Sequence, residues 1–174
     1  MDVYEAIRTK HATRKFADRP VPDEAIRRIV NAGRRAQSSK NTQPWHFVVV
    51  RDREALRQLS ACGTYAGHLR GAAFAVVYVS SDPAARWWIA FDLGQAAGYM
   101  QLAAWEAGVG SCIATFHEPE KVRPILGIPA GMVSHLALSF GYPAPGGRRP
   151  DVVQKGGRRP LDEVVHWERW GSKA

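Results

Sequence analysis

The sequence predicts an α+β fold in which helices wrap a central sheet. Two apolar runs, "AAFAVVYVSSD" at 72–82 and "SHLALSFGYP" at 134–143, have the pattern of strands that are buried on both faces. Segments with helical periodicity alternate with the strands, most clearly at 21–37. With 174 residues, 45% of them hydrophobic, the chain can bury the core of one domain.

The first half of the chain is predicted to alternate helices and strands. Pro22 and two acidic residues open the second helix, as is typical of a helix N-terminus, and Ile26, Ile29 and Val30 recur on one of its faces. The helix ends at the polar loop "SSKNTQPW", and "WHFVVVRD" then indicates a strand. The elements expected here are helices at 2–10, 21–37 and 53–63 and strands at 45–52 and 72–82.

The longest predicted helix, at 85–110, opens the second half. It has Ala or Gly on almost every turn and apolar residues around most of its circumference. We expect it to be central, because small residues allow helices to approach closely. A strand, a helix and a buried strand follow at 110–116, 118–128 and 134–143. Residues 144–174 form a Gly/Arg/Pro-rich linker and an aromatic-rich tail.

The tail raises a packing problem. Val164, Val165, Trp167 and Trp170 would form a costly exposed apolar patch at a chain end unless another surface covers them. A second subunit is one such surface, and the chain's own domain is the other. The residues alone leave both arrangements open.

Composition and motifs argue against several classes of protein. The longest apolar stretches fall far short of the roughly 20 residues that span a bilayer, and the first residues lack the apolar core of a secretory signal, so we expect a cytoplasmic protein. Cys62 and Cys112 are too few for a disulfide framework, and the six histidines have no metal-ligand spacing. HExxH, GxSxG and P-loop motifs are absent. If the chain is an enzyme, a cofactor rather than a catalytic side chain carries the reactivity.

The net charge of +8 invites an anionic partner. Two basic clusters, "KHATRK" at 10–15 and "KGGRRP" at 155–160, flank the chain, but no nucleic-acid-binding motif accompanies them. Guanidinium groups bind phosphate in a bidentate manner, and the Ser, Asn and Gln side chains of the polar loop suit the edge of a heterocycle. A phosphorylated ring cofactor would use both features. Taken singly, the loop residues are also ordinary turn formers, and each basic cluster an ordinary solvated surface.

Five segments keep a common order and spacing along nearly the whole chain. They are "KHATRKF", "SSKNTQPWHFVVV", "LAAWEAGVGSCIATF", "ILGIPAGMVSHLALSFGYP" and "GRRPLDEVVHWERWG". Together they resemble the FMN-dependent nitroreductase family. The resemblance implies a nitroreductase-like fold with a central, mostly antiparallel sheet, in which residues 1–174 are one FMN-binding domain. It also implies a homodimer that exchanges its C-terminal tails and has both active sites at the subunit interface.

The resemblance further implies a role for each candidate site residue. The family's first basic cluster, which binds the FMN phosphate and the pyrimidine edge, corresponds to Lys10, His11 and Arg14, with Ala12 where a serine is common. The loop that reaches the flavin from the partner subunit corresponds to Ser38, Ser39 and Asn41, preceded by Gln37. The strand end whose backbone approaches flavin N5 corresponds to Ile113, Ala114 and Thr115, the last two replacing a common glycine pair. The C-terminal phosphate clamp corresponds to Arg158 and Arg159, and a further contact falls near Tyr65 or His68.

The activity implied by the resemblance is that of an NAD(P)H-dependent flavin oxidoreductase. NADH or NADPH passes hydride to flavin N5, and a quinone, nitroaromatic or similar small oxidant then takes the place of the nicotinamide in a ping-pong mechanism. Two other classes stay open. A non-catalytic flavin-binding or storage protein would show no turnover with nicotinamides, and a basic nucleic-acid-binding module would interleave aromatic residues with Lys and Arg.

Overall fold

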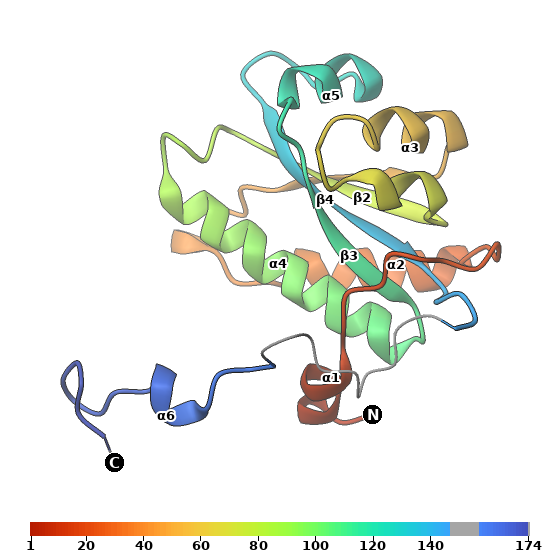
Figure 1. Cartoon of the computed structure of the whole chain (residues 1–174). Coiled ribbons are helices and arrows are strands. Elements are labelled where there is room, and N and C mark those ends of the chain that lie inside the picture. The colour runs from red at the N-terminus through yellow and green to blue at the C-terminus, as the bar shows by residue number, and fades with distance from the viewer. Residues whose placement is uncertain (147–156, 174) are drawn as a thin grey trace.

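The computed structural model, which describes residues 1–146 and 157–173, confirms the α+β fold (Figure 1). The linker expected within 144–174 falls in part on residues 147–156, outside the described residues. The helices are α1 (Val3–Thr9), α2 (Asp23–Arg34), α3 (Arg53–Leu59), α4 (Trp87–Glu106), α5 (Pro119–Leu126) and α6 (Leu161–Val164), with short 3-10 turns at Ser39–Asn41 and Gly67–Gly71. The strands are β1 (His46–Val50), β2 (Phe74–Ser80), β3 (Gly110–Thr115) and β4 (Val133–Gly141).

The four described strands form one sheet in the order β1-β2-β4-β3, and every neighbouring pair is antiparallel. The central strand β2 is buried along its whole length, as its continuous apolar run predicts. β1 and β3 are the edge strands of this sheet. Features carried by β1 and by β3 therefore lie about three strand spacings, or roughly 14 Å, apart.

Alternate side chains of β2 enter two separate cores, one on each face of the sheet. Phe74, Val76 and Tyr78 pack with α2 and α4, and the ring of Phe74 stacks on Phe140 of β4 at 4.7 Å between centroids. On the other face, Ala75 and its alternate neighbours pack with α3 and α5. Figure 1 shows these pairs of helices on opposite sides of the strands.

The long helix α4 packs closely on α2 and the sheet with one of its faces. A Cβ added at Gly33 of α2 would collide with the side chain of Met100, so the two helices approach through this glycine. The opposite face of α4 is different, because Trp87 and Phe91 are 75% and 64% exposed. Nothing lies within 4 Å of a Cβ added at Gly94 or Gly98. The apolar circumference that predicts a central helix is therefore only partly covered by the chain itself.

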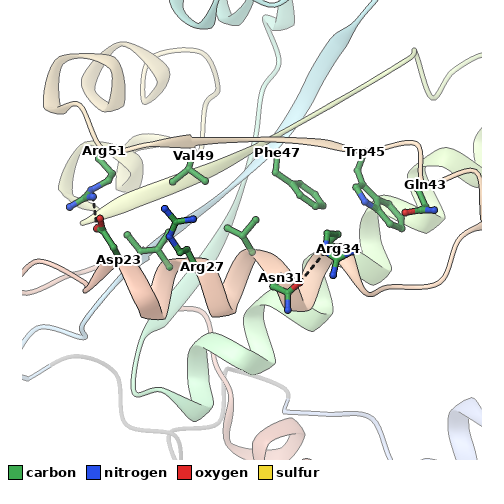
Figure 2. Close-up of a pocket in the computed structure, with 11 residues that line it drawn as sticks. Asp23, Arg27, Asn31, Arg34, Gln43, Trp45, Phe47, Val49 and Arg51 are labelled. Atoms are coloured by element: carbon green, nitrogen blue, oxygen red, sulfur yellow. Dashed lines mark hydrogen bonds and ion pairs between the residues drawn. The ribbon is translucent and has the colours of Figure 1, made fainter.

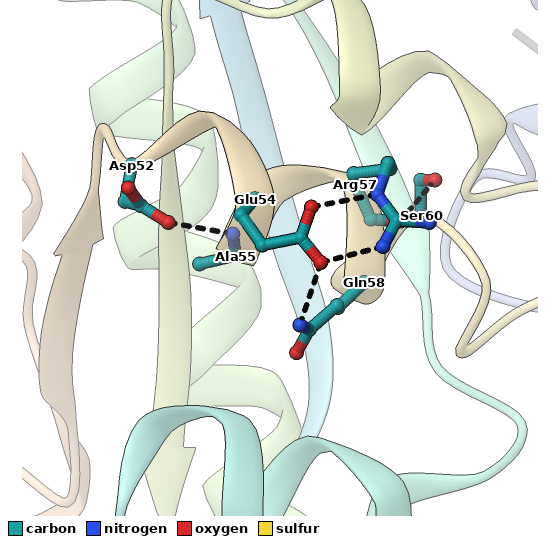
Figure 3. A network of polar contacts seen from close by, with 6 residues as sticks. All are labelled: Asp52, Glu54, Ala55, Arg57, Gln58 and Ser60. Carbon is teal, nitrogen blue, oxygen red and sulfur yellow. Dashed lines mark hydrogen bonds and ion pairs between the residues drawn. The ribbon is translucent and has the colours of Figure 1, made fainter.

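The start of α3 is fixed by a local polar network on the protein surface (Figure 3). Asp52 caps the helix by accepting a hydrogen bond from the Ala55 N–H at 2.8 Å. Glu54 accepts hydrogen bonds from Arg57 and Gln58, and the bond from Arg57 is the main cause that lowers the pKa of Glu54 to about 2. This network stabilises the helix locally, one turn before the segment that leads to the candidate site.

Two segments expose apolar residues that the sequence pattern predicts to be covered. In α1 only Ala6 is buried, while Val3 and Ile7 are exposed. The C-terminal tail extends away from the sheet and its helices in Figure 1, and Trp167 and Trp170 are 54% and 91% exposed. The described part of the chain does not provide enough apolar surface to bury the exposed side chains of either segment.

Candidate functional site

The segment that follows α1 runs along the outer edge of β3. Ala12 forms a parallel bridge with Ser111, and the Thr13 N–H donates to the Ser111 carbonyl at 2.9 Å. His11 lies with its ring edge-on to Trp105 of α4, at 4.8 Å between ring centroids. These contacts place the basic segment 10–14 beside the edge of the sheet, with the Arg14 side chain exposed.

The charge of Arg158, from the described part of the second basic cluster, acts on Lys10 of the first. The pKa of Lys10 lies below its ordinary value mainly because the side chain is partly buried, with Cys112 raising it and the charge of Arg158 lowering it. Arg158, far from Lys10 in the sequence, thus acts on it electrostatically. Arg158 and Arg159 are both exposed.

β3 directs part of its backbone toward the basic segment. Because strand residues alternate in direction and Ser111 points its carbonyl toward Thr13, Ile113 and Thr115 also point their backbone groups away from β4. The third predicted residue of this strand, Ala114, is buried and pairs with Ala137 of β4. Backbone contacts to a ligand at this edge would therefore come from Ile113 and Thr115.

His68 lies near the same edge of β3. It is held there by a hydrogen bond that no sequence motif predicts. Its Nδ1 lies 2.8 Å from the Ser139 hydroxyl, which in turn donates to the Cys112 carbonyl at 3.3 Å. Burial is the main cause that lowers the pKa of His68; the Ile113 backbone raises it in part, and the charge of Arg14 lowers it. His68 thus connects η2 (Gly67–Gly71) to the edge of β3 and to the basic segment.

Two buried side-chain atoms among the described residues lack a hydrogen-bond partner, and both belong to this cluster. They are Thr13 Oγ1 and His68 Nε2. Buried polar atoms in folded proteins are normally satisfied, and each exception calls for an explanation. A ligand that carries an anionic group and hydrogen-bonding edges fits this set of cations, strand backbone groups and unpaired polar atoms.

The polar loop after α2 is built rigidly. The Ser39 N–H donates to the Asp92 carboxylate of α4 at 3.0 Å, and the Gln43 N–H donates to the Ser38 hydroxyl at 2.9 Å. Lys40, Asn41 and Gln43 have positive φ angles of 51°, 55° and 47°, a region that non-glycine residues rarely adopt. The side chains that the loop offers to solvent include Gln37, Ser39 and Asn41.

The loop and the basic cluster lie at opposite ends of α4. The loop contacts Asp92, whereas the basic segment contacts Trp105, whose Nε1 donates to the Thr9 hydroxyl at 2.9 Å. Thirteen residues of helix separate these contacts, which is about 20 Å at the usual rise. The loop also leads into β1, at the opposite edge of the sheet from β3. One chain therefore brings together Lys10, His11, Ala12, Arg14, Ile113, Thr115 and Arg158, but not Gln37, Ser38, Ser39 and Asn41.

A groove lies between α2 and β1, away from the cluster (Figure 2). It encloses about 750 Å³. Its floor is apolar, made by Ile26, Val30, Trp45, Phe47 and Val49. Charged residues stand along its length, and among them Arg51 and Asp23 form an ion pair at 2.6 Å. None of the predicted site residues lines this groove.

Two features are absent from the described residues. Within residues 1–146 and 157–173, no group of three or more His, Cys, Asp or Glu side chains is arranged to hold a metal ion. In the same ranges, no helix combines the length and the apolar character needed to cross a bilayer.

Comparison with known proteins places the chain among relatives of the same architecture. A protein of Archaeoglobus fulgidus, provisionally named NADH dehydrogenase/NAD(P)H nitroreductase, is 33% identical over 94% of this chain and 96% of its own length. An FMN-dependent nitroreductase of Clostridium difficile superimposes with a TM-score of 0.84 at 26% identity, covering 97% of this chain and all of the other. A provisionally assigned nitroreductase of Desulfovibrio desulfuricans, solved in complex with FMN, gives a TM-score of 0.82 at 30% identity over 98% of both chains.

The match to a family model covers most of the described core. The model of the nitroreductase family aligns with residues 7–66 and 58–142, from the end of α1 to β4. The alignment thus spans both the basic segment 10–14 and the edge of β3. On this match, and on the 33% identity over nearly the whole chain, the protein belongs to the nitroreductase family.

Proposed function

We propose that this chain is an FMN-dependent NAD(P)H oxidoreductase whose active sites form between two subunits. The observation that carries the proposal is the course of the basic segment 10–14 along the outer edge of β3, where the charge of Arg158 also acts on Lys10. FMN is the cofactor named for two of the similar structures, and NAD(P)H is named for the Archaeoglobus relative. Bound here, FMN would accept hydride from NADH or NADPH and deliver it to a quinone, a nitroaromatic or a similar small oxidant.

Each part of the cluster has a role in holding such a cofactor. Lys10 and Arg158 supply the positive charge for the phosphate, where charge-assisted hydrogen bonds are strongest. Arg14 and His68, which interact electrostatically beside Ile113, provide polar contacts for the ring. Ile113 and Thr115 offer their backbone groups along the strand edge.

The exposed face of α4 supports a homodimer. Trp87, Phe91, Gly94 and Gly98 follow one another at steps of four, three and four residues, so they form one stripe of the helix. The two glycines have open space beside them and are not needed for packing within the chain. A two-fold axis across this stripe would set two α4 helices antiparallel. The loop at one end of α4 would then lie beside the basic cluster of the partner.

The groove between α2 and β1 is a suitable binding site for the partner's C-terminal tail. Its floor is apolar, like the exposed Leu161, Trp167 and Trp170 of the tail. Arg27 and Arg34 stand along the groove, and the tail carries the acidic residues Asp162, Glu163 and Glu168. Matching of apolar surface and charge favours exchange of tails between two chains over a tail that folds back.

The proposed function is tested on the purified full-length chain. We expect a visible flavin spectrum, FMN rather than FAD after heat release, and oxidation of NADH or NADPH when a quinone is added. Recovery of FAD, or no flavin after reconstitution with FMN, would contradict the cofactor assignment. Bound FMN without nicotinamide turnover would instead favour a flavin-binding or storage protein. A salt-dependent gel shift without any flavin would favour a nucleic-acid-binding module.

Removal of the Arg158 charge is expected to weaken FMN binding. A charge-assisted hydrogen bond contributes about 1.5 to 3 kcal/mol, so Arg158→Ala should raise the dissociation constant roughly 10- to 150-fold. Quenching of flavin fluorescence during titration with FMN measures this change. Arg169→Ala is the matched control, because Arg169 is an exposed arginine of the same tail. Equal losses in both variants would show that general charge, rather than a phosphate contact, is responsible.

A further inference from the structure

A single carboxylate connects α4 to the polar loop. Asp92 is 2% exposed and lies in an otherwise apolar stretch of the helix. Among the described residues, its hydrogen-bond partner is the Ser39 N–H, 3.0 Å from Oδ2, and no ion pair is formed. Burial of a carboxylate is costly unless specific contacts compensate for it. The core of α4 would be more stable with an apolar residue here, which indicates that Asp92 serves the loop.

The loop that Asp92 contacts is held in a conformation that it would not adopt alone. Three of its residues, Lys40, Asn41 and Gln43, have positive φ angles. Such conformations persist only where the surroundings over-determine them. Within the loop, the Asn41 N–H donates to the Ser38 carbonyl, the Thr42 N–H to the Ser39 carbonyl, and the Gln43 N–H to the Ser38 hydroxyl. Of the hydrogen bonds described for this loop, the one from Ser39 to Asp92 ties it to another element of the fold.

The anchoring leaves the loop's side chains free to bind. Asp92 engages the backbone of Ser39 from the protein interior, while the side chains of Ser39 and Asn41 are exposed. A loop that is already in its binding conformation loses little freedom when a ligand arrives. If the anchor were absent and the loop were competent for only a tenth of the time, the apparent affinity would fall tenfold.

We propose that Asp92 is a positioning residue that holds the strained loop 38–43 ready to contact the flavin bound by the partner subunit. The proposal rests on the proposed function, because the ligand of the loop is FMN. It makes Asp92 part of the site without any direct contact to the cofactor. The Ser39–Asp92 hydrogen bond is then what couples helix α4, on which we place the two-fold contact, to the geometry of the loop.

The test separates the hydrogen bond from the charge and from general stability. Asp92→Ala removes the acceptor, whereas Asp92→Asn keeps an oxygen that accepts from the Ser39 N–H. Ile89→Ala removes buried apolar surface from the same helix without touching the loop, since Ile89 is 3% exposed and packs in the core. Hydrogen–deuterium exchange of peptides covering residues 37–45 is measured on the cofactor-free full chain. FMN affinity is measured by fluorescence quenching.

We expect Asp92→Ala to speed exchange in the loop and to weaken FMN binding about tenfold or more. Asp92→Asn should stay close to the unchanged protein in both measurements, and Ile89→Ala should lower the melting temperature while leaving loop exchange slow. Slow loop exchange in Asp92→Ala would overturn the proposal. So would an Asp92→Asn variant as impaired as Asp92→Ala, or an Ile89→Ala variant with the same loop exchange as Asp92→Ala.

Ser39→Pro removes the N–H that donates to Asp92, and so breaks the same hydrogen bond. This variant replaces Asp92→Ala in the test if Asp92→Ala does not fold. Ser38 has extended backbone angles, which suit a residue before proline. Fast loop exchange in this variant supports the anchor, and slow exchange overturns it. If the unchanged protein binds no FMN, the proposed function fails, while the exchange measurements still decide whether Asp92 holds the loop.

Discussion

Truncation after Pro160 is expected to convert a yellow dimer into a colourless monomer. The deleted tail includes Leu161, Trp167 and Trp170, which are exposed on the chain by itself and which we place in the partner's groove. Buried tryptophans at interfaces commonly contribute about 2 kcal/mol or more each, so the loss of two corresponds to roughly thousandfold weaker association. Light scattering after size exclusion measures the mass, and absorbance near the flavin band measures cofactor retention.

The truncation keeps Arg158 and Arg159, so a loss of flavin cannot be assigned to the missing phosphate contacts. Truncation after Gly171 is the control, because it removes the last three residues and leaves both tryptophans in place. A protein truncated after Pro160 that stayed a flavin-loaded dimer would show that the tail does not hold the subunits together.

Gly63→Ala is expected to lower the free energy of unfolding by about 1 to 3 kcal/mol and to reduce FMN affinity. A Cβ at this position would collide with the Thr115 carbonyl, which is backbone and cannot rotate away. Either the turn at Gly63 or the end of β3 must shift. Because Thr115 belongs to the strand edge that we assign to the cofactor, the strain reaches the site. Urea denaturation and FMN titration give the two measurements.

Gly67→Ala is the matched control for this substitution. Gly67 lies four residues later in the same connection between α3 and β2, and a Cβ there would meet nothing within 4 Å. We expect a change of less than about 0.5 kcal/mol, as for most surface substitutions. If Gly63→Ala were as mild as Gly67→Ala, the end of β3 would be more tolerant than its packing indicates.

The regular elements and the cores follow closely from local pattern. β2 is predicted because every residue from Phe74 to Val79 is apolar, and all of them are buried. The helix at 21–37 is predicted from Pro22 and the spacing of Ile26 and Ile29, and α2 buries both isoleucines. In these segments, the conformational propensity of the residues, the spacing of the apolar positions and their burial all favour the same element. A short window of sequence is therefore enough to predict it.

The contacts of Asp92 and His68 could not be predicted from any single short stretch of the sequence. Asp92 acts through a loop 53 residues away, and the only local sign is an acidic residue within an apolar helix. The orientation of the His68 ring depends on Ser139 of β4, which is 71 residues away in the sequence. The exposed side of α1 is a further example. The spacing of Val3 and Ile7 predicts a helix with one buried face, but no surface within the described residues covers that face.

The outer edge of β1 has a consequence for how the protein is made. Phe47 to Val50 are four apolar residues without proline or charge, on a strand that pairs on one side only in the described structure. Unprotected edges of this kind recruit other strands and promote aggregation. The ribosome completes β1 long before the tail that we assign to the neighbouring chain. We therefore expect slower synthesis to raise the soluble yield, because fewer chains with an unprotected β1 edge are then present at the same time.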